Sequence, residues 1–117
     1  MRTVQLSIAD AGYAAALREA LTRTGPWHVD MVDRPDPAIP GVLVLDESSF
    51  ERLPLPLVNP ERVVLISQHD PQLLARAWDA SIVSVISRDD SLATVLLAIM
   101  AAVLRAGKIA SPALVPA

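Results

Sequence analysis

This sequence of 117 residues contains no cysteine, few aromatic residues and no excess of positive charge. The absence of cysteine excludes disulfide bonds, thiolate metal sites and thiol nucleophiles. Aromatic residues make up only 3% of the chain, so a core has to be built from Val, Leu, Ile and Ala. The net charge of −3 gives no basic surface, which argues against direct binding of nucleic acid.

The sequence also lacks the segments and motifs that mark membrane proteins and common enzymes. Residues 1–5 have no apolar core of a signal peptide, and the longest apolar stretch, around residues 96–104, is too short to span a bilayer. The four glycines are not clustered, and no phosphate-binding loop, nucleophile elbow or H-E-x-x-H zinc motif occurs. We therefore expect a cytoplasmic domain that makes no contact with a membrane and is not an enzyme.

What the sequence does contain is a series of short apolar segments typical of β-strands. Residues 42–45 and 63–66 are apolar at every position, which predicts strands buried on both faces of a parallel sheet. Apolar and polar side chains alternate in residues 4–10 and 27–31, which predicts a first strand that runs to residue 10 and an edge strand. Residues 82–86 predict a fifth strand.

Three longer segments have the apolar spacing and the end signals of helices. Residues 11–23 place apolar side chains on one face and are followed by Gly and Pro. A second helix is predicted to start at Asp70 and Pro71, residue types preferred at these positions, and a third to span residues 92–106 and end before Gly107. The expected buried face of the second helix consists of Leu73, Leu74, Ala77 and Trp78.

The order of these elements predicts the fold class. Residues 34–40 contain three prolines, which exclude a helix between the second and third strands, and residues 49–53 form one helical turn at most. Strands alternating with helices predict an α/β fold with a flavodoxin-like, doubly wound, five-stranded parallel sheet of order 2-1-3-4-5. We expect one domain over residues 1–110 and a linker or tail over residues 111–117.

Polar side chains stand at the ends of four predicted strands: Asp10, Asp46, Ser67 and Arg88. Since the carboxyl ends of parallel strands meet at one edge of a sheet, we expect these residues to lie close together. A pair of carboxylates can hold a hard divalent cation, and a hydroxyl with a cationic group can bind a phosphoryl group. The alternative is that all four are ordinary loop residues.

Four stretches resemble the receiver domain of bacterial two-component response regulators, above all receivers that precede a LuxR/NarL-type helix-turn-helix. They are residues 64–71, 77–81, 86–91 and 105–112. The resemblance implies that Asp46 is the phosphoacceptor and that Asp10 and Asp46 hold Mg²⁺. It also implies that Ser67 is the switch hydroxyl and that Arg88 binds the phosphoryl group.

The chain departs from the receiver pattern at several points, so we interpret it as a degenerate receiver. Ala9 precedes Asp10 where the family has a second acid, which leaves the Mg²⁺ site incomplete; no other cofactor is expected. Arg88 replaces a lysine, which keeps the charge and changes the geometry. Val85 stands where the family has a switch aromatic, the second helix is missing and the third is shortened.

The last predicted helix has almost no polar face. A helix that is apolar all round is buried all round, which in one small domain requires a partner. Receivers of this kind pair through their fourth and fifth helices and fifth strand, so we expect a homodimer; a helix exposed mainly through its alanines is the alternative. The expected interface residues are Leu92, Val95, Leu96, Ile99, Met100 and Val103.

The resemblance implies a signalling module of a two-component or phosphorelay system. It would regulate an output domain through dimerisation, with a histidine kinase as its phosphodonor and with DNA contacted only by a separate output domain. The alternative is a pseudo-receiver that is independent of phosphorylation and is controlled by a protein partner or a small ligand. A flavodoxin-like enzyme or cofactor binder is a third interpretation, which the absence of a Gly-rich loop disfavours.

Overall fold

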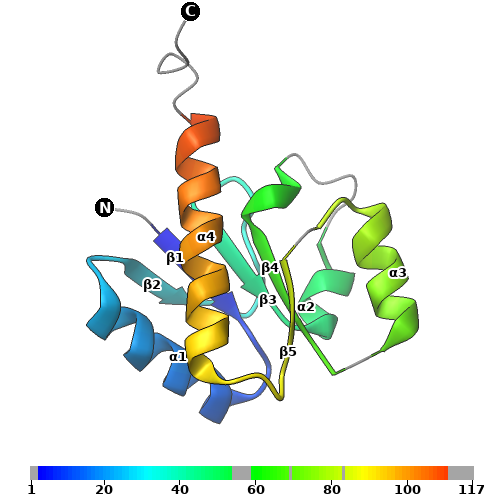
Figure 1. The fold of residues 1–117 in the computed structure, drawn as a ribbon, viewed down its shortest axis with the longest axis horizontal. Coiled ribbons are helices and arrows are strands. Elements are labelled where there is room, and N and C mark those ends of the chain that lie inside the picture. Colours follow the sequence, from blue (N-terminus) through cyan, green and yellow to red (C-terminus); the bar gives the residue numbers. More distant parts are fainter. Residues whose placement is uncertain (1–2, 54–58, 69, 83, 111–117) are drawn as a thin grey trace, which may run out of the picture.

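The computed structural model describes residues 3–53, 59–68, 70–82 and 84–110, with side chains up to residue 105. Within these residues, five parallel strands form one sheet of order β2-β1-β3-β4-β5 (Figure 1), which confirms the predicted topology. The expected tail, 111–117, lies outside the described residues. The strands are β1 (Thr3–Ser7), β2 (His28–Met31), β3 (Val42–Leu45), β4 (Val63–Ser67) and β5 (Ser84–Ser87).

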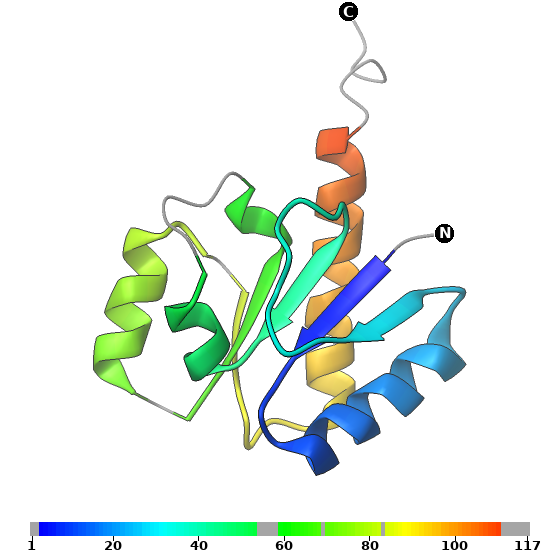
Figure 2. The ribbon, with the colours of Figure 1, turned by 180° about the vertical axis from the view of Figure 1, so that it is seen from behind.

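Helices cover both faces of the sheet. The long helices α1 (Ala11–Thr24) and α4 (Leu92–Ala110) lie on one face, as Figure 1 shows. The opposite view in Figure 2 shows α2 (Glu47–Glu51) and α3 (Pro71–Asp79) on the other face. A 3₁₀ turn, η1 (Pro60–Arg62), precedes β4.

The fully apolar strand β3 is buried on both sides, as predicted. Val42 and Val44 belong to the core beneath α1 and α4, whereas Leu43 and Leu45 belong to the core beneath α2 and α3. The alternation follows from the two-residue period of a strand. Burial of both faces explains why this strand carries no polar side chain.

Several predicted boundaries are wrong. The first strand ends at Ser7 instead of Asp10, because the Asp10 side chain accepts a hydrogen bond from the Tyr13 N–H (3.1 Å) and so caps α1. The fifth strand begins at Ser84, two residues later than predicted. Helix α4 passes through Gly107 to Ala110, since glycine permits a helix end without imposing one.

The predicted buried face of α3 is only half correct. Leu73 and Ala77, four residues apart, are fully buried, whereas Trp78 is 82% exposed and Leu74 is also exposed. Each residue advances about 100° around a helix, so positions 74 and 78 form the stripe beside the buried one. On this helix of nine residues that stripe projects away from the sheet.

The chain crosses from β2 to β3 without a helix, as the prolines predicted. The crossing segment, residues 32–41, is held by two buried polar side chains, one in β1 and one in the turn η1. The side-chain amide of Gln5 pairs with the main chain of Asp36. Arg62 is only 8% exposed, and its guanidinium donates to the carbonyls of Ile39 (2.7 Å), Gly41 (3.1 Å) and Pro37.

Gly41 closes the crossing segment in a conformation that suits glycine alone. Its φ is +122°, and a Cβ added there would lie 2.1 Å from the carbonyl oxygen of Thr3. Any side chain at this position would therefore collide with the start of β1. The close approach lets β3 begin directly beside β1, where Val4 pairs with Val42.

Candidate functional site

The four polar residues at the strand ends fall at the carboxyl edge of the sheet, as expected, but they do not all face the same space. Asp10, Asp46 and Arg88 line a cavity of about 250 Å³. Ser67 does not line it: the residue is 3% exposed, and its hydroxyl has no hydrogen-bond partner among the described residues. The structure therefore brings together three of the four predicted residues.

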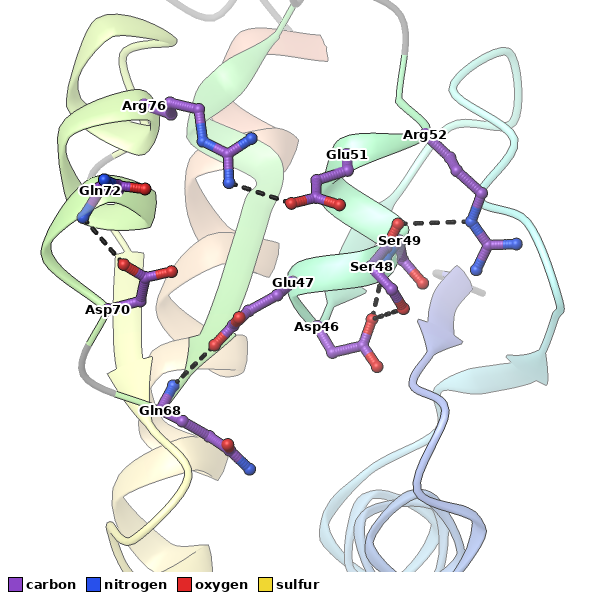
Figure 3. A network of polar contacts seen from close by, with 10 residues as sticks. All are labelled: Asp46, Glu47, Ser48, Ser49, Glu51, Arg52, Gln68, Asp70, Gln72 and Arg76. Atoms are coloured by element: carbon purple, nitrogen blue, oxygen red, sulfur yellow. Dashed lines mark hydrogen bonds and ion pairs between the residues drawn. The ribbon is translucent and has the colours of Figure 1, made fainter.

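Asp46 serves as the N-cap of α2. One carboxylate oxygen, Oδ1, accepts hydrogen bonds from the Ser49 N–H (3.0 Å) and the Ser48 hydroxyl (3.1 Å), as Figure 3 shows. The other, Oδ2, accepts the N–H of Ala9 at 2.8 Å. Burial alone would raise the pKa of Asp46, but these hydrogen bonds outweigh burial and hold the pKa below its ordinary value.

The position of Asp46 follows directly from the local sequence. Helix α2 starts at Glu47, immediately after the carboxylate, and Asp is among the residue types preferred at an N-cap. The short helix needs an acceptor for its free N–H groups, and Asp46 supplies it. Both oxygens of this carboxylate therefore have structural partners within the chain.

Arg88 is directed at Asp10 instead of Asp46. Its guanidinium forms an ion pair with the Asp10 carboxylate, and its Cζ lies 5.6 Å from the centre of the Tyr13 ring. The Arg88 N–H donates to the carbonyl of Ser67 at 2.9 Å, which fixes the start of the side chain beside β4. The positive charge expected to meet a phosphoryl group is thus already paired with a carboxylate.

The residues present do not fit the Mg²⁺ site that the resemblance implies. Asp10 is paired with Arg88, and both oxygens of Asp46 accept internal hydrogen bonds. Ala9 contributes a main-chain N–H to the cavity where the family has an acid. Among the described residues, no three His, Asp or Glu side chains are grouped so that they could hold a metal ion.

Tyr13 lines the same cavity, although its sequence pattern did not predict it as a site residue. Its hydroxyl is buried and has no hydrogen-bond partner among the described residues, and burial, followed by the negative charge of Asp90, raises its pKa. The signal that could have found it is its position three residues after Asp10. A residue in the first turn of a helix lies at the same edge of the sheet as the N-cap.

Glu47 and Glu51 tie α2 to its neighbours on the side of β4. The Glu47 carboxylate accepts the N–H of Gln68 at 3.1 Å, and Glu51 pairs with Arg76 of α3 at 3.1 Å (Figure 3). The first contact closes one wall of the cavity, since Glu47 and Gln68 both line it. Helix α2 is therefore held at both ends, although it has only five residues.

Half of the expected dimer surface belongs to the chain's own core. Val95, Ile99 and Val103 are buried against the sheet, which corrects their assignment to an interface. The reason is that α4 has a fully buried stripe as well as an exposed one. On the outer side, Leu97 is 67% and Leu104 is 63% exposed.

Within the described residues, no helix is long and apolar enough to cross a membrane.

No protein-family model and no curated protein sequence matches this chain. Solved structures of response regulators do match. The response regulator StyR superposes with a TM-score of 0.75 at 20% identity over 95% of this chain, which spans 63% of the StyR chain. FixJ-N superposes with a TM-score of 0.63 at 18% identity, over 89% of this chain and 94% of its own.

Full-length FixJ from B. japonicum gives a similar result, with a TM-score of 0.60 at 18% identity over 94% of this chain and 61% of FixJ. The similarity lies in the architecture: one parallel sheet of order 2-1-3-4-5 with helices on both faces. At these identities it concerns the fold and not the residues of the site. The chain therefore has the fold of response-regulator receivers.

Proposed function

We propose that this chain is a regulatory receiver-like module that works without Mg²⁺-dependent phosphorylation of Asp46. One observation carries the proposal: both oxygens of the Asp46 carboxylate accept hydrogen bonds from the chain itself. A phosphoacceptor needs an oxygen that is free to attack phosphorus and a cation that offsets the charge of the incoming group. Here one oxygen of Asp46 caps α2 and the other accepts the N–H of Ala9.

The electrostatics of the cavity support the same proposal. Arg88 is the cationic side chain of the cavity lining, and its charge is balanced by Asp10. Asp46 receives neutral N–H and hydroxyl donors, which lower its pKa and so weaken it as a nucleophile. Transfer of a phosphoryl group to Asp46 would break the cap of α2 and leave the dianion without a paired cation.

The test is an amide NMR titration with Mg²⁺ followed by beryllofluoride, which mimics a phosphoryl group on an aspartate. We expect the signals of Ala9, Ser49 and Arg88 to stay unchanged in the wild-type chain. The variant Ala9→Asp with Arg88→Lys restores the acid and the lysine but keeps the donors to Asp46, so it should also stay unchanged; a response of this variant would contradict the role given to these hydrogen bonds. Shifts in the wild type that disappear in Asp46→Asn would instead identify a working phospho-switch, with a histidine kinase as its partner.

We further propose that the module acts through a homodimer formed by the outer face of α4. The exposed side chains Leu97 and Leu104 are seven residues apart and therefore share one side of the helix. Exposed leucines on one side of a helix form an apolar surface that a second copy of the chain can cover. Leu92, also exposed, and the half-buried Leu96 and Met100 remain from the interface expected from the sequence.

The regulated element is proposed to be an output domain, of which DNA-binding transcription regulators are the candidates. The match with StyR, a response regulator of which this chain spans 63%, supports this part of the proposal. Joining the chain to a DNA-binding domain and measuring reporter transcription for wild type and for Leu97→Glu tests it. Equal transcription from both would contradict control of output through the dimer.

A further inference from the structure

A second cavity lies beside α2 at the same edge of the sheet. It measures about 590 Å³ and is lined by the ends of β1 and β2, the first residues of the crossing segment, and α2. Small-molecule sites in proteins span about 300–1,000 Å³. The segment after β2, whose first residues line the cavity, crosses to β3 without a helix (Figure 2).

The lining of this cavity combines six apolar residues with two exposed residues of opposite charge and two serines. The charges are the Asp33 carboxylate and the Arg52 guanidinium, and the hydroxyls of Ser7 and Ser49 bond each other at 2.7 Å. The apolar lining residues are Leu6, Ile8, Ala9, Ala11, Met31 and Val32. Met31 is exposed although it is a large hydrophobic side chain.

Neither charged group forms an ion pair within the described residues. The Arg52 Nε–H donates to the carbonyl of Ser48 (3.3 Å). The terminal nitrogens of Arg52 have no partner among the described residues. Asp33 contributes its main-chain carbonyl to Ser7 (3.4 Å), while its carboxylate has no partner in the described part of the chain. Figure 3 shows Arg52 on the side of α2 that faces β1, away from Glu47 and Gln68.

We propose that this cavity binds a small zwitterion with an apolar side chain, the chemistry of an apolar α-amino acid. The guanidinium of Arg52 would take the carboxylate through paired N–H donors, and Asp33 would take the ammonium group. Ile8, Met31 and Val32 would cover the side chain. The inference rests on the proposed function, because it supplies the signal that replaces phosphorylation.

Contacts shared with the first cavity give the bound ligand a route to Asp46. Ser49 lines the second cavity and donates its N–H to Asp46. Ala9 lines both cavities and donates to the other Asp46 oxygen. A ligand held by Arg52 therefore contacts the helix that Asp46 caps, and its occupancy biases the position of α2.

The experiment is an amide NMR titration of the whole chain with L-leucine, L-isoleucine, L-valine and L-methionine. At least one amino acid should shift the signals of Ala9, Met31 and Ser49. Isocaproate and isopentylamine, which carry the leucine skeleton with only one of its charges, should bind at least about tenfold more weakly. Asp33→Asn and Arg52→Gln should each weaken binding by a similar factor, and Arg34→Gln, an exposed arginine outside the cavity, should leave binding unchanged.

Two results would overturn the inference. One is the absence of any shift with all four amino acids at millimolar concentration. The other is isocaproate binding as tightly as leucine with Asp33→Asn unaffected, which would make the cavity a plain anion site. The titration contains neither Mg²⁺ nor beryllofluoride, so its failure is separate from failure of the proposed independence from phosphorylation, which the beryllofluoride titration tests.

Discussion

The side-chain amide of Gln5 pairs with the main chain of Asp36 through two hydrogen bonds, one donated to its carbonyl and one accepted from its N–H, each at 2.9 Å. Gln5 lies in the middle of β1 and is almost fully buried. The amide satisfies a peptide group of the crossing segment in the way that a neighbouring strand would. A polar residue of the sheet thereby replaces the apolar contacts that a covering helix would make.

Replacing Gln5 with leucine should destabilise the chain by about 1–3 kcal/mol, because the N–H and the carbonyl of Asp36 lose their partners while they stay partly buried. Urea denaturation followed by circular dichroism measures the free energy of unfolding. Gln72→Leu, at an exposed position of α3, is the matched control and should change stability by less than about 0.5 kcal/mol. Equal effects of the two substitutions would contradict the role of Gln5.

Arg62→Lys should also destabilise the chain, by about 2 kcal/mol, although it keeps the charge. A lysine ammonium has no planar fork and cannot reach the carbonyls of Pro37, Ile39 and Gly41 together. The control is Arg76→Lys, which alters an exposed ion pair with Glu51 and should cost no more than about 0.5 kcal/mol. The midpoints of thermal unfolding compare the two variants. A loss of stability in Arg76→Lys as large as in Arg62→Lys would argue against the role of the Arg62 hydrogen bonds.

Asp46→Ala should destabilise the chain by about 1 kcal/mol near neutral pH, the usual effect of losing an N-cap. The pKa of Asp46 is lower in the folded chain than in the unfolded chain, so its carboxylate stabilises the fold above its unfolded pKa, and this stabilisation is lost as pH falls. The difference between wild type and Asp46→Ala should therefore shrink below about pH 4. Urea titrations at several pH values measure it, and a difference independent of pH would exclude a role for the charge.

Leu97→Glu with Leu104→Glu should convert the proposed dimer into a monomer, because two carboxylates would have to be buried in the interface. Sedimentation equilibrium measures the association, and circular dichroism should show an unchanged fold, since both side chains are exposed. The matched control is Leu74→Glu on α3, which lies on the opposite face of the sheet. A wild-type chain that remains monomeric at high concentration would refute the dimer.

Most strands and helices could be predicted from local patterns, and their alternation predicted the order of the sheet. Residues 42–45 and 63–66 carry enough consecutive apolar side chains to identify interior strands, and the pair Asp70 and Pro71 marks a helix start by residue type. The prolines of residues 34–40 correctly excluded a helix. Each of these signals depends on neighbours in the sequence, which is why sequence reasoning recovered them.

The polar core and the direction of Arg88 could not be predicted. Gln5 in an alternating strand has the pattern of a solvated residue, and its partner, Asp36, is 31 positions away. Arginine is a residue type usually found at the surface, yet Arg62 is buried. Its guanidinium donates to carbonyl groups about 20 to 25 residues earlier in the chain. Residue type at a strand end placed Arg88 in the cavity, but the choice between Asp10 and Asp46 depends on side-chain geometry.

The hydrogen bonds from Gln5 and Arg62 to the crossing segment constrain its length more than its side chains. Gln5 and Arg62 bind main-chain atoms of residues 36, 37, 39 and 41, so the side chains between these points carry little of the attachment. Substitutions at residues 37–40 that keep the path of the main chain should therefore leave this attachment intact. Insertion or deletion of a single residue there would move the carbonyls out of reach of the guanidinium, so the attachment depends more on the number of residues than on their side chains.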